Sequence, residues 1–528
     1  MVLVTTKAAK TGVMQISYEG ATGVQMPTYL PKMVNSAEYA EMYRLAERNT
    51  GVPEANLTFT DEMIQKYRDG SDPDRYPNTN WFDLIVRKQS FITKHNVQFS
   101  GGVEKFKYLL DGGFFREEGA SRGDVTDRYN LNSKTSSDIK KWLTLTSNIN
   151  FIYTKHNNTR GGINFVEALR VPPTQVAKHS NGEWGTVRNG RQTTSEETNA
   201  NPYRSWAENG RSSSTARRLL GSIAAEVRPF EKVKVTNQFA YSYYDYRGFS
   251  FANRKKGVPS FLNPASGIIA GTASTNNQMD LDWFYSDKFI YDGWLNYDQT
   301  FNDLHAVTLM IGAHTDIYSF RRLTVGRKNF ASNDMNDFSG GSLKEVDQIL
   351  TDTKNNINYY EEESINSYFG RIGYTYDQKY LFEANFRADA SSRFAKKGRW
   401  GYFPSFSVGW RVDQEKFMEN ATWLDGLKLR ASWGENGNIK NIGLYDTYST
   451  YDSGGTTVLG GVSVPTLTEG RIGNPDLTWE TTASTNIGLD LSIGKGLINI
   501  TADLYNRLTK GILIRANDIM AETGLSSS

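Results

Sequence analysis

Residues 141–154 read KWLTLTSNINFIYT, and apolar and polar side chains alternate along most of this stretch. The apolar residues of one parity are Leu143, Leu145, Ile149, Phe151 and Tyr153. Because successive side chains of a β-strand point to opposite faces, this strand has one apolar and one polar face. A soluble β-sandwich contains such strands too, so the stretch by itself predicts only an all-β fold.

Fifteen stretches of the chain show this alternation, and the connections between them are alternately short and long. Short turns are predicted at 101–102, near 136–138, and at 229–230, 301–303, 377–379 and 494–496. Long loops are predicted near 155–217, 248–285, 322–358 and 437–479, and two helices in an earlier excursion, over 36–49 and from 60 to 70. Long loops gathered at one end and short turns at the other are typical of a transmembrane antiparallel β-barrel with extracellular loops.

The charged residues of the predicted strands keep to one parity. Glu383, Arg387, Asp389 and Arg393 share a face in 380–393, and Arg411 lies on the polar face of the next strand. A charge is hydrated inside a barrel lumen but costs several kcal/mol on the lipid face. We therefore place these five residues in the lumen. They are candidates for a substrate path or for a contact with a plug, although a self-neutralising polar wall is the favoured interpretation.

Composition limits the other classes of protein. Among 528 residues, 38% are hydrophobic, and no run of roughly 18 apolar residues predicts a spanning helix. Aromatic residues make up 13%, which suits membrane interfaces and also aromatic-rich carbohydrate-binding sandwiches. The absence of cysteine excludes disulfides and thiol chemistry, and the net charge of +2 gives no pull toward nucleic acid.

The ends of the chain predict a fragment. Residues 1–7 read as a strand in the middle of a domain and not as a signal peptide, and residues 524–528 complete no element. Fifteen is also an odd number of strands, whereas bacterial single-chain barrels have even numbers. We therefore expect an incomplete barrel.

Seven short motifs follow one another along the chain: VLVTTK (2–7), NSAEYA (35–40), GGVEK (101–105), FRADASSRF (386–394), FPSFSVGW (403–410), LRASWG (429–434) and NPDLTWE (474–480). Together and in this order they resemble the SusC/RagA-type family of TonB-dependent outer-membrane transporters of Bacteroidetes. The resemblance covers nearly the whole chain, and it is specific because the motifs keep the family's order.

The resemblance implies a barrel of about 22 strands around an N-terminal plug domain, of which this chain holds about 15. Residues 1–11 then correspond to the last strand of the plug, and residues 12–528 to a partial barrel without its C-terminal strands. The resemblance also implies import of oligosaccharides, other glycans or peptides, a SusD-like surface lipoprotein as a lid, and energy from TonB–ExbB–ExbD. The plug and its TonB motif have no counterpart here, so we expect active transport to need the full-length parent.

Motifs of covalent chemistry are missing from the sequence, which predicts no catalytic site, no cofactor and no enzyme activity. Of the five histidines, His305 and His314 share a strand but face opposite sides, so they cannot converge on one metal. His156 and His179 lie in or beside the 155–217 loop, where a ligand pair is possible, but solvated loop histidine is the favoured interpretation because ligand spacing is absent. The acidic run 361–363 is interpreted as a loop margin in preference to an ion site. The loop aromatics Trp184, Tyr203, Trp206 and Phe261 are candidates for stacking on sugar or for contact with a lid, although packing of the loops on themselves is slightly favoured.

Two alternative functions stay open at this point. A secreted carbohydrate-binding or carbohydrate-active β-protein would use the aromatic residues to hold sugar. A passive porin would share the barrel and would lack the plug and the TonB dependence. Cargo cannot be read from these residues.

Overall fold

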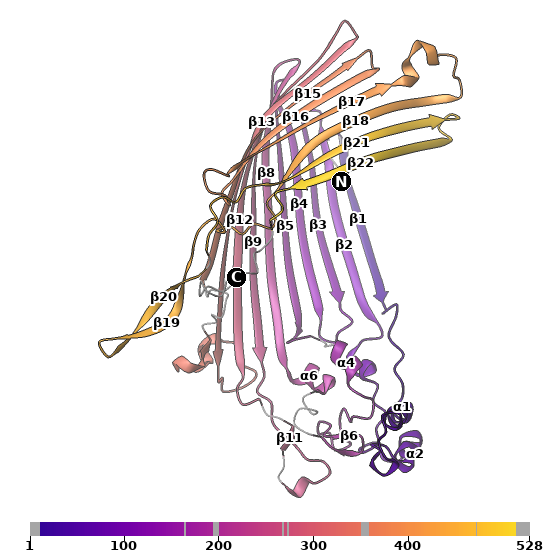
Figure 1. Cartoon of the computed structure of the whole chain (residues 1–528), viewed down its shortest axis with the longest axis vertical. Helices are drawn as coiled ribbons and strands as arrows, with labels where there is room; N and C mark the ends of the chain where they lie inside the picture. Colours follow the sequence, from indigo (N-terminus) through magenta and orange to yellow (C-terminus); the bar gives the residue numbers. More distant parts are fainter. Residues whose placement is uncertain are drawn as a thin grey trace.

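A single antiparallel sheet forms most of the computed structural model (Figure 1), which describes residues 11–162, 165–193, 200–266, 269–271, 274–349, 358–470 and 472–513. Fifteen strands pair in chain order from β1 to β22, and the short β14 pairs beside β13. The predicted fifteen strands are thereby confirmed. They are β1 (Gly12–Gln25), β2 (Ser90–Val103), β3 (Phe106–Glu118), β4 (Val125–Lys140), β5 (Leu143–Thr159), β8 (Gly210–Phe230), β9 (Val233–Ala252), β12 (Gln278–Phe301), β13 (His305–Lys328), β15 (Asn358–Tyr376), β16 (Tyr380–Ser391), β17 (Trp400–Arg411), β18 (Leu424–Asn438), β21 (Glu480–Ile493) and β22 (Ile498–Lys510), with β14 at Gln348–Ile349.

The two faces of the sheet differ in polarity as the alternation predicts. Ile223, Phe239 and Ile311 are exposed on one face, which we call the apolar face. Glu383 and Arg387 lie on the other, the polar face. In Figure 1 the strands β15–β18, β21 and β22 lie at an angle to β1–β5, as the regular twist of a sheet requires. No helix in the described part of the chain is long and apolar enough to cross a membrane.

The longest hairpin extends well beyond its predicted bounds. β12 and β13 pair without interruption from Gln278↔Lys328 to Phe301↔His305. The sequence predicted their loop ends near 286 and 320. A segment of the next loop covers the apolar face of this extension, where Phe251, Met279 and Phe330 are fully buried. The added strand length is stabilised by this burial, and the alternation of apolar and polar residues continues through it at Met279, Leu281 and Trp283.

Three predicted turns are confirmed by backbone dihedrals. Asn302 and Asp303 have φ values of 50° and 57°, and Asp377 and Gln378 have φ values of 47° and 54°. Residues 494–496 all have positive φ as well. Left-handed conformations of this kind suit Asn, Asp and Gly, which explains why the turns were readable from the sequence.

The turn predicted at 101–102 was wrong, because β2 continues through Gly101 and Gly102. The chain reverses two residues later, where Val103 pairs with Phe106 across Glu104 and Lys105. Gly102 has a φ of 153°, and a Cβ at this position would lie 2.3 Å from the Phe106 carbonyl oxygen. The glycine therefore permits a close approach of two backbones beside the turn.

Two further turns lie later in the chain than predicted, because strand pairing continues through the residues that were predicted to turn. Phe230 still pairs with Val233, so the turn lies at 231–232 and not at 229–230. β4 likewise runs to Lys140, beyond the turn predicted near 136–138, and its pairing with Leu143 places the reversal at 141–142.

The long loops form a rim of helices and short hairpins at one end of the strands (Figure 1). The predicted first helix is confirmed with its capping box, in which Asn35 and Glu38 exchange hydrogen bonds. The helices are α1 (Ser36–Asn49), α2 (Asp61–Asp69), α3 (Trp81–Ile85), α4 (Phe165–Arg170) and α6 (Pro202–Glu208). The short pairs are β6–β7 (Val187–Arg188, Arg191–Gln192), β10–β11 (Val258–Pro259, Ile269–Gly271) and β19–β20 (Tyr451–Leu459, Val462–Glu469).

The predictions for the chain ends cannot be compared with the structure. Residues 1–10 hold nearly all of the predicted last plug strand, and residues 514–528 hold the C-terminal segment that closes no predicted element. Both lie outside the described residues.

Candidate functional site

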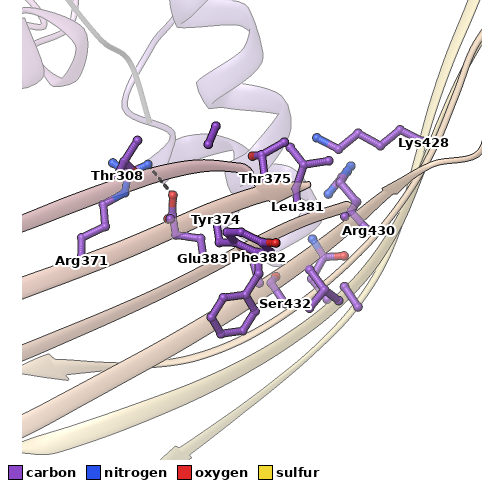
Figure 2. Close-up of a pocket in the computed structure, with 17 residues that line it drawn as sticks. Thr308, Arg371, Tyr374, Thr375, Leu381, Phe382, Glu383, Lys428, Arg430 and Ser432 are labelled. Atoms are coloured by element: carbon purple, nitrogen blue, oxygen red, sulfur yellow. Dashed lines mark hydrogen bonds and ion pairs between the residues drawn. The ribbon is translucent and has the colours of Figure 1, made fainter. Parts of the chain in front are cut away.

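A pocket of about 450 Å³ opens on the polar face between β13 and β21 (Figure 2). Arg371, Glu383, Lys428 and Arg430 bring charge to its lining, and Thr308 adds a hydroxyl group. These side chains come from β13, β15, β16 and β18. All of them project to the same face, because each occupies a polar-face position of its strand. The pocket lies nearer the short turns than the rim.

The charges around this pocket are largely neutralised by one another. Arg371 forms an ion pair with Glu383, which also accepts a 2.9 Å hydrogen bond from Asn385. Arg430 forms ion pairs with Asp490 and Asp503, with N–O distances of 3.1 and 2.7 Å. A surface with paired donors and acceptors can form hydrogen bonds with a neutral polar solute and gives little net field for a strongly charged one.

Arg387 and Asp389 lie farther along β16, away from the pocket. The Arg387 Nε atom lies 2.8 Å from Asp389 Oδ1, and an Nη of Arg387 donates to Ser367 Oγ over 2.9 Å. Asp389 is buried, whereas half of the Arg387 side chain is open to solvent. This pair therefore extends the polar wall toward the rim.

The two remaining candidates lie at opposite ends of the wall. Arg393 binds both carboxylate oxygens of Glu363 at the rim, with N–O distances of 2.6 and 2.9 Å. Arg411 donates to Asp413 over 3.2 Å beside a short turn, where Asp413 also accepts from the backbone of Leu427. The five predicted residues thus share a face without forming one site.

Sequence reasoning missed Arg371, Lys428 and Arg430 as members of the pocket. The usable signal was present, because each has the polar parity of its strand. Their convergence depends on which strands are neighbours and in what register, which parity does not give.

The acidic run 361–363 is divided between the two faces. Glu363 is held by Arg393 on the polar face, and Glu362 accepts a hydrogen bond from the Tyr360 hydroxyl on the apolar face. Within the described ranges, no three His, Asp or Glu side chains are grouped in a way that could hold a metal ion.

The loop aromatics pack on one another at the rim. The Trp184 and Tyr203 rings meet edge to face with centroids 5.5 Å apart, and Tyr203 stacks on Trp206 at 5.8 Å. Both indole N–H groups are engaged, with Glu208 Oε1 and with the Arg122 carbonyl oxygen. This arrangement matches the favoured prediction that the loops fold on themselves.

His179 lies between three loop segments and is fully buried, so its predicted solvated position was wrong. Its ring stacks on Phe261 with centroids 3.9 Å apart. Nε2 accepts from the Thr186 backbone N–H over 3.0 Å, and Nδ1 lies 3.2 Å from Asp74 Oδ1. The ring is therefore neutral, with its proton on Nδ1.

The pKa values of this pair follow from burial and hydrogen bonding. Burial lowers the pKa of His179 below its usual value of 6.5, and Asp74 opposes that effect only in part. Burial raises the pKa of Asp74, but hydrogen bonds from Ser180 and His179 outweigh it and hold this pKa below the ordinary range. The contact is therefore built for a neutral imidazole and an ionised carboxylate.

We expect the rim around His179 to loosen in acid. Because the folded-state pKa is below the unfolded value, the unfolded loop binds a proton more readily, so packing present above about pH 6.5 is lost as the pH falls. Amide hydrogen exchange in 174–193, corrected for intrinsic rates, should be faster at about pH 5 than at about pH 8. His179→Phe keeps a ring against Phe261 and should remove the difference; an unchanged pH dependence in this variant would contradict the assignment.

Comparison with known proteins agrees with the fold. Residues 173–524 match the family described as TonB dependent receptor-like, beta-barrel. TonB-dependent receptor P39 of Formosa agariphila is 26% identical over 532 residues, covering 100% of this chain and 46% of the relative. TonB-dependent receptor SusC of Bacteroides thetaiotaomicron is 26% identical over 461 residues, covering 83% of this chain and 43% of SusC.

A solved structure shares the same architecture. The structure of the RagAB peptide transporter superposes with a TM-score of 0.76 at 19% identity, covering 99% of this chain and 58% of that chain. At this identity the likeness concerns the fold. The chain spans about half the length of the curated relatives that it matches. The match over 173–524, the strand order and these relatives show that the chain belongs to the TonB-dependent receptor family, as part of its outer-membrane β-barrel.

Proposed function

We propose that this chain forms part of the barrel wall of a TonB-energised importer, which carries oligosaccharides, other glycans or peptides across the outer membrane. The observation that carries the proposal is the ion-paired polar face in a chain of the TonB-dependent receptor family. A lumen of this kind is wet and offers many weak hydrogen bonds, so a polar polymer can move along it without being trapped. The proposal includes no covalent step.

The pocket on the polar face supports a polar, uncharged or weakly charged cargo. Its arginines are paired with carboxylates, and Lys428 is the lining cation that forms no ion pair within the described residues. RagAB is named a peptide transporter, and the SusC relative carries no cargo in its name. Glycan and peptide therefore both stay within the proposal.

The rim supports a lid lipoprotein of the SusD type as partner. Four apolar side chains are exposed before and along α1: Met26, Tyr29, Met42 and Leu45. Apolar groups exposed at the rim favour contact with another protein. Energy would come from TonB–ExbB–ExbD acting on a plug domain.

The experiment is uptake by cells that express the full-length receptor with its lipoprotein. Fluorescein-labelled maltooligosaccharides and a labelled tryptic peptide mixture are offered to cells with and without tonB. We expect one class to enter and expect deletion of tonB to abolish its entry. Uptake that persists without tonB would favour a passive porin, and receptor found in the soluble fraction would favour a secreted β-protein.

A further inference from the structure

Two guanidinium groups on the apolar face share one buried carboxylate. Arg217 of β8 donates from Nη1 to Asp245 Oδ2 over 3.0 Å, and Arg247 Nε of β9 lies 3.3 Å from the same oxygen. The other oxygen accepts from Trp283 Nε1 over 2.7 Å. The Asp245 side chain is 2% exposed, whereas those of Arg217 and Arg247 are 42% and 58% exposed. The carboxylate thus fixes both cations while its own charge is covered.

This pair of arginines, which we call the arginine clamp, lies at the edge of an uncharged band, on the side of the long loops. On the apolar face, every position of β8 between 219 and 227 and of β9 between 233 and 243 is uncharged. Nine to eleven tilted strand residues span the hydrocarbon layer, about 25 Å. The clamp is the first charge beyond that band toward the long loops, which places it at the headgroup level of the outer leaflet.

Neighbouring residues extend the clamp into a short row. Lys155 of β5 pairs in register with Thr215 of β8, and Thr215 pairs with Arg247 of β9. Side chains directly opposite one another lie about 5 Å apart, so the Thr215 hydroxyl stands between two cations. The acid opposite Lys155 is Asp127, whose carboxylate is already 3.3 Å from Arg116.

Aromatic rings lie beside these cations and next to them toward the membrane centre. The Arg217 guanidinium carbon is 5.9 Å from the centre of the Tyr153 ring. Tyr243 and Phe151 continue the apolar face toward the membrane centre. A ligand held here would meet cations and a hydroxyl at its head. Toward the membrane centre it would meet the uncharged, partly aromatic surface of β5, β8 and β9, beside which Asp287 of β12 accepts a hydrogen bond from Tyr241.

We propose that Arg217, Arg247, Thr215 and Lys155 bind the phosphate group of an anionic lipid of the outer leaflet. The guanidinium nitrogens that Asp245 does not engage donate to phosphate oxygens, since a planar fork matches phosphate geometry. The acyl chains lie along the uncharged band. This site is on the opposite face of the sheet from the proposed transport path and does not depend on that function.

The test uses the full-length receptor in detergent micelles and native mass spectrometry. Monophosphoryl lipid A and the same lipid without its phosphate serve as probes. We expect the phosphorylated lipid to bind at least about tenfold more tightly, the effect of one charge-assisted hydrogen bond, and Arg217→Gln/Arg247→Gln to remove that preference. Excess inorganic phosphate should leave the bound lipid in place.

The matched control is Arg322→Gln, which removes an arginine of the same 42% exposure that is held by Asp282 on the polar face. It should keep the preference for the phosphorylated lipid. Heat-modified gel migration verifies assembly, and Arg247→Gln alone serves if the double variant fails to assemble. Equal binding of both lipids by wild type, an unchanged preference in the variants, or displacement by inorganic phosphate would each overturn the proposal.

Discussion

Ile311→Arg is expected to lower the free energy of unfolding by about 2–4 kcal/mol, the cost of an arginine near the middle of the lipid layer. Ile311 lies in the centre of the uncharged span of β13 and is 64% exposed on the apolar face. In a bilayer that exposure is contact with acyl chains, which offer no hydrogen bond to a guanidinium.

The neighbouring substitution Met310→Arg is the control, because it places the same side chain on the opposite face. Met310 lines a cavity of about 190 Å³ together with Asp298 and Arg371, so a new arginine there has space and a carboxylate nearby. We expect a loss below about 1 kcal/mol. Urea titration of the full-length receptor in phospholipid vesicles, followed by gel mobility, measures both. Equal losses would contradict the assignment of the two faces to lipid and lumen.

Trp81→Ala is expected to disorder the rim while the wall stays intact. The Trp81 side chain is buried in a cluster with Phe82, Val171 and Ala177, and its indole N–H donates to the Pro172 carbonyl oxygen over 3.2 Å. Removing a buried tryptophan costs about 3–5 kcal/mol. Since this cluster joins loop segments only, hydrogen exchange should rise in 81–86 and 165–177 and stay slow in β12 and β13.

The control for this prediction is Trp142→Ala at the opposite end of the strands. Trp142 lies in a short turn and is 52% exposed, so its truncation should leave exchange at the rim unchanged. Loss of heat-modified migration in Trp81→Ala would show that the rim and the wall unfold together, and unchanged rim exchange would show that the cluster contributes little.

The wall was predictable because its signal is local. Alternation along 141–154 assigns a face to each residue without knowledge of any partner strand, and the turn at 302–303 is encoded by residues that tolerate positive φ. The rim was not predictable in the same way. Its contacts join Trp81 to Pro172 and Asp74 to His179, about a hundred residues along the chain, and short loop segments carry no periodicity.

The candidate site shows the same division. The face of Glu383 followed from parity, and its partner Arg371 lies across the adjacent turn. Arg430 and its partners Asp490 and Asp503 are separated by the long loop near 437–479, so their register cannot be counted from a turn. Burial of His179 was missed because a loop histidine looks the same in sequence whether it is solvated or enclosed.

The strand order has a consequence for the way this chain is made. Apart from β1 and β22 at the two ends of the sheet, each of the fifteen strands pairs with the strand before it and the strand after it in chain order, and most of these pairs are hairpins. The conformational entropy of the chain is therefore lost in small steps, and each loss is offset by contacts with the preceding strand. The rim contacts close loops of about a hundred residues, as Asp74 and His179 do. The sheet can thus form hairpin by hairpin, and the loops of the rim pack together only after the strands that carry them have paired.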